Sequence, residues 1–141
     1  RQTGYEFGTT TGRPRRCGWL DLVALKYVFE MSGITSIALT KLDVLNDFDK
    51  IKVAVGYNVE GRKIKSFPAS IAFCEKIEPE YVELKGWKCD IAKIRNYDEL
   101  PQEAKDYISF IEEKLGVPVS IISVGPGRDE TIIRKEYLSL F

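Results

Sequence analysis

The chain has 141 residues, is 44% hydrophobic, and carries 21 basic and 21 acidic side chains, which give a formal net charge of zero. A chain of this length and composition can enclose one sizeable core, so we expect a single domain over residues 1–141. The zero net charge excludes a global field that attracts nucleic acid or an anionic membrane, so any anion site must be local.

Apolar runs and cysteines indicate the compartment. No apolar run approaches the roughly 20 residues that span a bilayer, and no charged-then-apolar leader opens the chain. The cysteines Cys17, Cys74 and Cys89 are far apart, and the chain has no histidine to complete a zinc site. We therefore expect a cytoplasmic protein with no membrane or nucleic-acid partner, no metal ligands in this chain, and buried thiols. Because the sole methionine is Met31, we also expect the chain to be part of a longer protein.

The first recognisable feature is a loop rich in hydroxyl and guanidinium groups. Gly12 permits backbone angles closed to other residues, whereas Pro14 fixes its own φ and pushes Arg13 toward an extended conformation. Hydroxyls and N–H groups in a tight turn converge on oxyanions, and an Arg fork binds a carboxylate or phosphate at two points. The pattern predicts an anion-binding loop; the alternative is a basic surface loop that leads into a helix. Its residues are Thr9, Thr10, Thr11, Gly12, Arg13, Pro14, Arg15 and Arg16.

A helix and a buried strand are predicted next. Apolar residues at three-and-four spacing predict a helix from about Gly18 through Met31, ended by Gly33, with its apolar stripe in the core. The apolar run Ile34–Leu39 then predicts a short buried strand. In an α/β sheet, ligands bind at the carboxyl ends of such strands.

The polar tip of that strand, Thr40–Asp43, suggests base recognition. A carboxylate only accepts hydrogen bonds, so Asp43 can take both the N1–H and the N2–H of guanine, a donor pair that adenine lacks. The stem of Lys41 can lie along the face of the base. The alternative is that Asp43 simply caps the segment that follows.

The middle of the chain predicts β-structure. Lys50–Val59 alternates and is rich in β-branched residues, with a turn at Asn58–Gly61 and a return strand at Arg62–Lys65, which indicates a hairpin. Beyond it we expect a loop with short strands around Ala69–Phe73 and Tyr81–Leu84.

The last third predicts a helix followed by a central strand. We expect a helix from Glu99 to about Leu115, with Asp98 as its N-cap and Gly116 at its end. Val117–Val124 then forms a continuous apolar strand, typical of a parallel strand covered on both faces.

If this strand is parallel to Ile34–Leu39, it brings Ser123, Val124 and Gly125 to the same edge as Asp43. Their backbone N–H groups could there donate to guanine O6; the alternative is a simple strand-exit turn. The segment Thr131–Phe141 is either a last short strand or an extension. The expected fold class is α/β, a mostly parallel sheet flanked by helices with a β-hairpin insertion.

Several catalytic signatures are absent from the sequence. It contains no G-x-x-x-x-G-K-[ST] phosphate loop, no histidine to act as a general acid near neutral pH, and no clustered carboxylates for magnesium. We expect no catalytic residue in this chain and little activity from the chain alone.

Three segments carry a family resemblance. Residues 6–21, 39–45 and 123–128 resemble, in this order, the substrate loop and two further signatures of adenylosuccinate synthetase. The resemblance implies the C-terminal third of that enzyme, within a larger P-loop-like nucleotide-binding fold. It also implies that the phosphate loop, the catalytic Asp and His and the Mg²⁺ ligands lie in the N-terminal part. The whole enzyme would transfer the GTP γ-phosphoryl group to the 6-oxygen of IMP, and L-aspartate would displace it.

The resemblance also implies residue roles. Thr9, Thr10, Thr11, Gly12, Arg13, Pro14 and Arg15 would form the loop that binds aspartate and IMP, with Arg15 also reaching GTP. Lys41, Leu42 and Asp43 would hold guanine, helped by Ser123, Val124 and Gly125. Thr40 stands where related GTP-binding motifs more often carry Asn. Family members are usually homodimers, so we expect a dimer. The alternative function is a non-catalytic guanine-nucleotide-binding or regulatory module.

Overall fold

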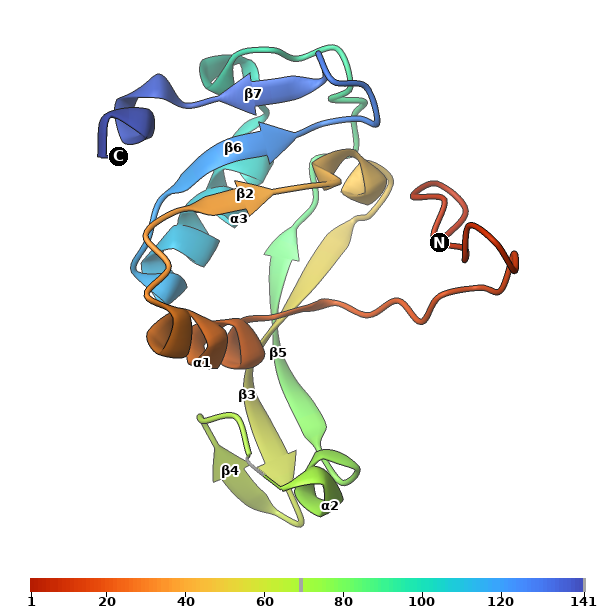
Figure 1. Cartoon of the computed structure of the whole chain (residues 1–141), viewed down its shortest axis with the longest axis vertical. Coiled ribbons are helices and arrows are strands. Elements are labelled where there is room, and N and C mark those ends of the chain that lie inside the picture. The colour runs from red at the N-terminus through yellow and green to blue at the C-terminus, as the bar shows by residue number, and fades with distance from the viewer. Residues whose placement is uncertain (69, 141) are drawn as a thin grey trace.

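The computed structural model describes residues 1–68 and 70–140 (Figure 1). Its helices are α1 (Leu22–Ser32), α2 (Ile71–Cys74) and α3 (Gln102–Leu115), with 3-10 turns η1 (Leu42–Leu45), η2 (Tyr97–Glu99) and η3 (Lys135–Leu140). Its strands are β1 (Leu20–Asp21), β2 (Ile37–Leu39), β3 (Lys50–Val59), β4 (Arg62–Ile64), β5 (Glu78–Lys85), β6 (Val119–Ser123) and β7 (Thr131–Ile133).

The described strands form two mixed sheets rather than the one mostly parallel sheet that we expected. In the first, β3 is parallel to β1 and antiparallel to β4 and β5; in the second, β6 is parallel to β2 and antiparallel to β7. Strands joined by a short turn pair antiparallel, as β3 and β4 do through Glu60 and Gly61, both with positive φ. The α/β class and the hairpin are confirmed.

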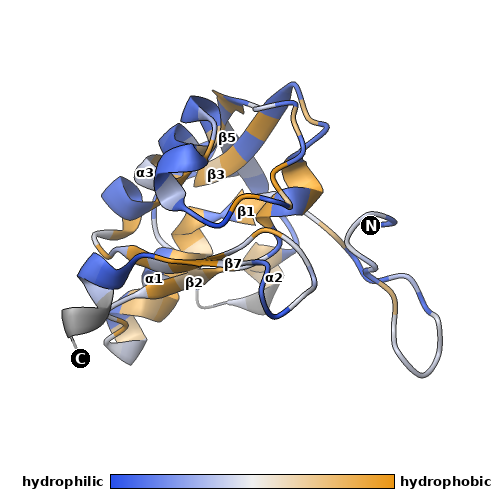
Figure 2. Cartoon of the chain, turned by 90° about the horizontal axis from the view of Figure 1, so that it is seen from above, coloured by the Kyte–Doolittle hydropathy of each residue, from blue (hydrophilic) through white to orange (hydrophobic). Residues whose placement is uncertain are grey.

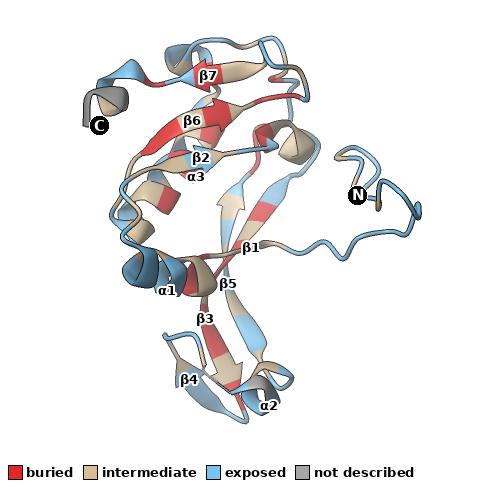
Figure 3. Ribbon diagram, viewed as in Figure 1, coloured by how far each residue is buried: buried red, intermediate tan, exposed pale blue. Residues whose placement is uncertain are grey.

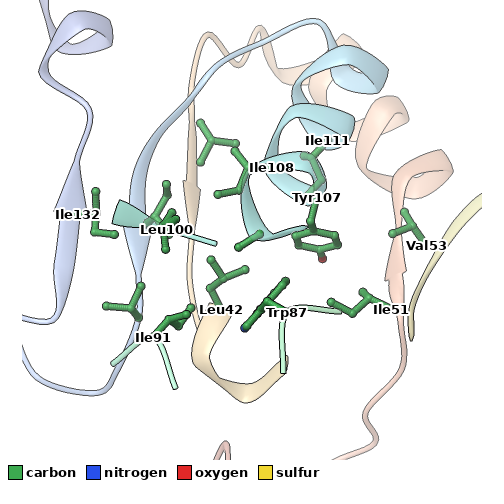
Figure 4. Close-up of a cluster of buried hydrophobic side chains, with 14 of the residues drawn as sticks. Leu42, Ile51, Val53, Trp87, Ile91, Leu100, Tyr107, Ile108, Ile111 and Ile132 are labelled. Carbon is green, nitrogen blue, oxygen red and sulfur yellow. The ribbon is translucent and has the colours of Figure 1, made fainter. Parts of the chain in front are cut away.

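The core lies between the second sheet, α3 and the upper part of the first sheet (Figure 4). Helix α3 presents Tyr107, Ile108 and Ile111 to this cluster, and Trp87 fills its lower part. The indole Nε1 of Trp87 donates to Asn46 Oδ1 at 2.9 Å, so this buried donor is satisfied. Figure 2 shows the hydrophobic residues concentrated in this body, whereas the N-terminal segment is mostly pale or hydrophilic with short hydrophobic stretches.

Helix α1 begins three residues later than Trp19. Asp21 Oδ1 accepts hydrogen bonds from Val23 N at 3.0 Å and Ala24 N at 3.1 Å, so the N-cap is Asp21 and not a residue near Gly18. The predicted end is confirmed, because Gly33 adopts φ 62° and donates to Phe29 O.

The apolar stripe of α1 is only partly in the core. Leu22 and Val23 are buried, but Tyr27 and Val28 are each 46% exposed and Met31 is 71% exposed. The expectation that the whole stripe is core is wrong, since the described elements cover only the first turn of that face.

Helix α3 begins at Gln102, and Asp98 is not its N-cap. Asp98 lies in the 3-10 turn η2, where Asn96 accepts from its N–H. Pro101 keeps Leu100 extended at ψ 144°, which separates this turn from the helix. The predicted end is confirmed by Gly116, at φ 72°.

Two further expectations fail in the peripheral segments. Residues 71–74 form α2 instead of a strand, with Ser70 O accepting from Phe73 N and Cys74 N; Ala69 lies outside the described residues. Cys17 and Cys89 are exposed and Cys74 is half-buried, so the expected burial of the thiols is wrong. The two exposed cysteines lie on irregular connections, which run over the surface. The tail resolves into β7 and η3, and Phe141 lies outside the described residues.

A partly buried hydrogen bond joins the N-cap of α1 to β3. The Tyr57 hydroxyl donates to Asp21 Oδ2 at 2.6 Å while Asp21 Oδ1 caps the helix. Burial, and secondly the hydrogen bond to Asp21, raise the pKa of Tyr57 well above its usual range, so the hydroxyl stays a donor. Replacing Tyr57 with Phe should lower the free energy of unfolding by about 1.5–3 kcal/mol, as for a bond to a charged group.

Urea unfolding of the protein that contains this chain measures this effect. The control is Tyr81→Phe on β5, where the side chain is 43% exposed and its hydroxyl loss should change little. Equal unfolding free energies for the two variants would contradict the expectation.

Candidate functional site

The predicted anion-binding loop forms a narrow turn at the N-terminal side of the molecule. Phe7 and Pro14 pair as an isolated antiparallel bridge, Gly8 N donates to Arg13 O at 2.8 Å, and Gly12 N donates to Gly8 O at 2.8 Å. Gly12 has φ 64°, the left-handed conformation that glycine adopts without strain, as its place in the sequence predicted. The turn therefore holds residues 8–13 as a compact tip.

The side chains of this tip face solvent. Thr9, Thr10, Thr11 and Arg13 are exposed, and the N-terminal segment is exposed along most of its length (Figure 3). Thr11 Oγ1 accepts from Arg13 N at 3.3 Å. Among the described residues, Arg13 makes no ion pair, so its guanidinium is available to an anion.

Glu6 connects the base of this loop to the predicted guanine segment. Its Oε2 lies 3.2 Å from Arg15 Nη1, and its Oε1 accepts from Lys41 Nζ. Lys41 Nζ also donates to Gly4 O at 2.8 Å. The hydrogen bond from Lys41 is the largest influence that lowers the pKa of Glu6, followed by an opposing effect of burial and then by the bond from Arg15. Glu6 is thus ionised between two cations.

The strands β2 and β6 run parallel, with Leu39 opposite Ile122. This pairing confirms the expectation that Thr40–Asp43 and Ser123–Gly125 leave the sheet at the same edge (Figure 1). Asp43 is half-buried in η1, whereas Leu42 is 1% exposed and packs into the core. Leu42 therefore fixes the segment from below and offers a ligand only its backbone.

The strand-exit turn after β6 is closed by Glu130. Glu130 Oε2 accepts from Gly127 N at 2.5 Å, and Glu130 O accepts from Val124 N at 2.9 Å. The Val124 N–H is therefore engaged within the chain. The expectation that it is a free donor for guanine O6 is wrong. A Cβ on Gly125 would meet the Glu130 carboxylate, which would have to shift to make room for it.

Sequence reasoning missed Glu130 and Glu6. The signal for Glu130 was a carboxylate five residues beyond Gly125, close enough to fold back onto a glycine-rich turn. Glu6 carries no local signal of this kind, since its partners Arg15 and Lys41 lie far along the chain.

A cleft of about 600 Å³ lies beside these segments. Of the predicted anion-binding loop and guanine segments, Arg16 and Lys41 line it, whereas the tip of the loop, Asp43 and the turn after β6 do not. Its apolar wall includes Trp19 and Phe48, whose rings meet edge to face at 5.1 Å. The cleft is lined by Arg1, Thr3, Gly4, Glu6, Arg16, Cys17, Gly18, Trp19, Lys41, Val44, Leu45 and Phe48.

Neither a metal cluster nor a membrane span appears in the part of the chain that the structure describes. No group of three His, Cys, Asp or Glu side chains there could hold a metal ion. No helix over residues 1–68 and 70–140 is long and apolar enough to cross a membrane.

Comparisons with known proteins agree on one family. The family profile of adenylosuccinate synthetase matches residues 1–132. The adenylosuccinate synthetase of Geobacter sulfurreducens is 53% identical over 133 residues, which cover 94% of this chain and 31% of that protein. Adenylosuccinate synthetase 2, chloroplastic, of Physcomitrium patens is 52% identical over 96% of this chain and 26% of its own length.

A solved structure shows the same fold. The structure of fully ligated adenylosuccinate synthetase from Plasmodium falciparum superposes with a TM-score of 0.90 at 43% identity, covering 95% of this chain and 32% of that one.

The match is long within this chain and short within its relatives. The chain spans about a third of the length of the curated relatives it matches. The position of this third within the relatives stays a prediction. The resemblance of the three motifs predicts that it is the C-terminal third. With more than nine-tenths of its length matched at about 50% identity, the chain belongs to the adenylosuccinate synthetase family.

Proposed function

We propose that this chain supplies the aspartate loop and the guanine-binding residues of a GTP-dependent ligase that joins IMP and L-aspartate to adenylosuccinate. The observation that carries the proposal is the parallel pairing of β2 with β6. It brings Lys41–Asp43 and Ser123–Gly125 to one sheet edge, and Glu6 links that edge to Arg15 of the loop.

Each segment has a role in the proposed reaction. Asp43 accepts the N1–H and N2–H of guanine, while the Lys41 stem lies along the base. Gly125 offers a backbone N–H, and Ser123 orders the turn by donating to Gly125 O at 2.9 Å. Arg15 approaches the phosphates of GTP.

The loop tip binds the second substrate. Arg13 grips carboxylate oxygens of aspartate and also contributes to the IMP site, with the hydroxyls of Thr9, Thr10 and Thr11 around them. Phosphorylation of the 6-oxygen of IMP converts a poor leaving group into a good one, and aspartate then displaces phosphate. Gly12 and Pro14 give the tip its shape.

The remaining parts of the reaction lie outside this chain in our proposal. As the family resemblance implies, the Mg²⁺ ligands, the phosphate loop and the general acid would belong to the part of the ligase outside this chain. We further propose that residues 1–141 form one domain of a cytoplasmic homodimer. The chloroplastic relative shows that compartment varies within the family.

One experiment tests the function. The intact mass of the purified protein is measured together with adenylosuccinate formation dependent on GTP, IMP and aspartate. A mass near three times the 16.0 kDa of this chain, with activity, supports the ligase. Guanine-nucleotide binding without product at that mass would instead support the non-catalytic module.

A further inference from the structure

The backbone of Glu6 is fixed by hydrogen bonds of its own, independently of the contacts that its side chain makes. Its N–H donates to Arg1 O at 3.0 Å, and its carbonyl accepts from Arg15 N at 2.9 Å. Its neighbour Phe7 is paired with Pro14 in the bridge that forms the turn. The carboxylate therefore projects from a fixed point at the base of the loop.

That carboxylate contacts two cations from different segments. Arg15 comes from the loop and Lys41 from the end of β2, and both face Glu6. Lys41 has φ 59°, a left-handed conformation that is costly for a residue with a side chain. Its ammonium is fixed by Glu6 and by Gly4 O.

Folding stability does not account for such an arrangement. The side chains of Arg15 and Lys41 are 57% and 49% exposed, and ion pairs this exposed contribute little to stability. What Glu6 does restrict is the freedom of two long side chains. Ordering a side chain of this kind costs conformational entropy, and a preorganised site does not lose that entropy again on binding.

We propose that Glu6 is a positioning residue that sets Lys41 and Arg15 for a guanine nucleotide. The inference rests on the proposed function, because it takes both cations to contact that nucleotide. Glu6 itself touches no substrate. It acts by holding the Lys41 stem along the face of the base and the Arg15 guanidinium toward the phosphates.

The test is Glu6→Gln in the ligase that contains this chain, with GTP varied at saturating IMP and aspartate. Glutamine keeps the size of the side chain and one acceptor oxygen but loses the charge. We expect the KM for GTP to rise about 5–10-fold while kcat changes less than twofold, since positioning acts on binding. Glu6→Asp, which keeps the charge, should recover part of the loss.

The matched control is Glu83→Gln on β5. Glu83 also bridges two cations, with Lys50 Nζ at 2.7 Å and Lys52 Nζ at 3.7 Å, and none of the three residues lines the cleft or belongs to the proposed site. The Glu83→Gln variant measures how the loss of a carboxylate between two cations affects the GTP KM when the carboxylate lies outside the proposed site. A rise in the GTP KM in both variants alike would overturn the proposal.

Double mutants distinguish the proposed role of Glu6 from the proposed guanine site. If Glu6 acts through the cations, Glu6→Gln combined with Lys41→Met or with Arg15→Gln gives less than the sum of the single effects. If the effects on the GTP KM are fully additive with both partners, or if Glu6→Gln leaves the GTP KM unchanged or lowers it, the proposed role of Glu6 is refuted. The proposed guanine site is not affected by either result. If Lys41→Met and Asp43→Asn also leave the GTP KM unchanged, the proposed guanine site itself fails.

Discussion

Replacing Asp43 with Asn is expected to raise the KM for GTP by about 10–100-fold, because a donor NH₂ then faces the donor edge of guanine. A lost partner of this kind costs roughly 1–3 kcal/mol, and more when charge is involved. Xanthine carries a carbonyl where guanine carries the 2-amino group, so the variant should narrow the advantage of GTP over XTP and ITP. Initial rates with each nucleotide measure the change.

The control for this substitution is Asp47→Asn. Asp47 is an exposed carboxylate in the same connection between β2 and β3, and its replacement by Asn removes the same charge. A GTP KM that is equal in the two variants would remove Asp43 from the site.

Replacing Arg13 with Leu is expected to raise the KM for aspartate by tens-fold or more. The guanidinium binds a carboxylate at two points, and its loss costs a few kcal/mol at roughly 1.4 kcal/mol per decade. The change should fall mainly on aspartate and IMP, whereas the GTP KM depends on other residues. Saturation curves for the three substrates distinguish these effects.

Arg62→Leu serves as the control for Arg13. Arg62 is an exposed arginine on β4, at the far end of the hairpin from the loop (Figure 1). An aspartate KM that stays at the unaltered value in Arg13→Leu would exclude the assigned role.

Local patterns predicted those parts of the fold that depend on local chemistry. Glycines at positions 33 and 116 end their helices as predicted, because a left-handed C-cap favours glycine. The hairpin of β3 and β4 was also predicted, from the alternating strand pattern and its turn residues. The shared edge of the two polar tips was predicted on the condition that their strands are parallel, and the pairing of β2 with β6 meets that condition.

Tertiary context decided the parts that sequence reasoning missed. Asp98 has the properties of an N-cap, but Pro101 forces an extended residue between it and the helix. Asp21 is a preferred N-cap residue type that we passed over in favour of the neighbourhood of Gly18, and its carboxylate also accepts a hydrogen bond from Tyr57 of β3.

The candidate site divides in the same way. Residue types and spacing indicated the loop, Lys41 and Asp43, since each group has a chemical use at its own position. The bridge made by Glu6 depends on contacts between distant segments, and no local pattern encodes it. The occupation of the Val124 N–H by Glu130 likewise follows only from the folded turn.

The two tryptophans of this chain are intrinsic fluorescent probes of the core and of the loop. Trp87 is buried and hydrogen-bonded to Asn46, so its emission reports the integrity of the core. Trp19 follows the loop directly and lines the cleft against Phe48. With Trp87 changed to Phe, Trp19 is the remaining tryptophan of residues 1–141, and its fluorescence there reports rearrangement of the loop without an attached dye.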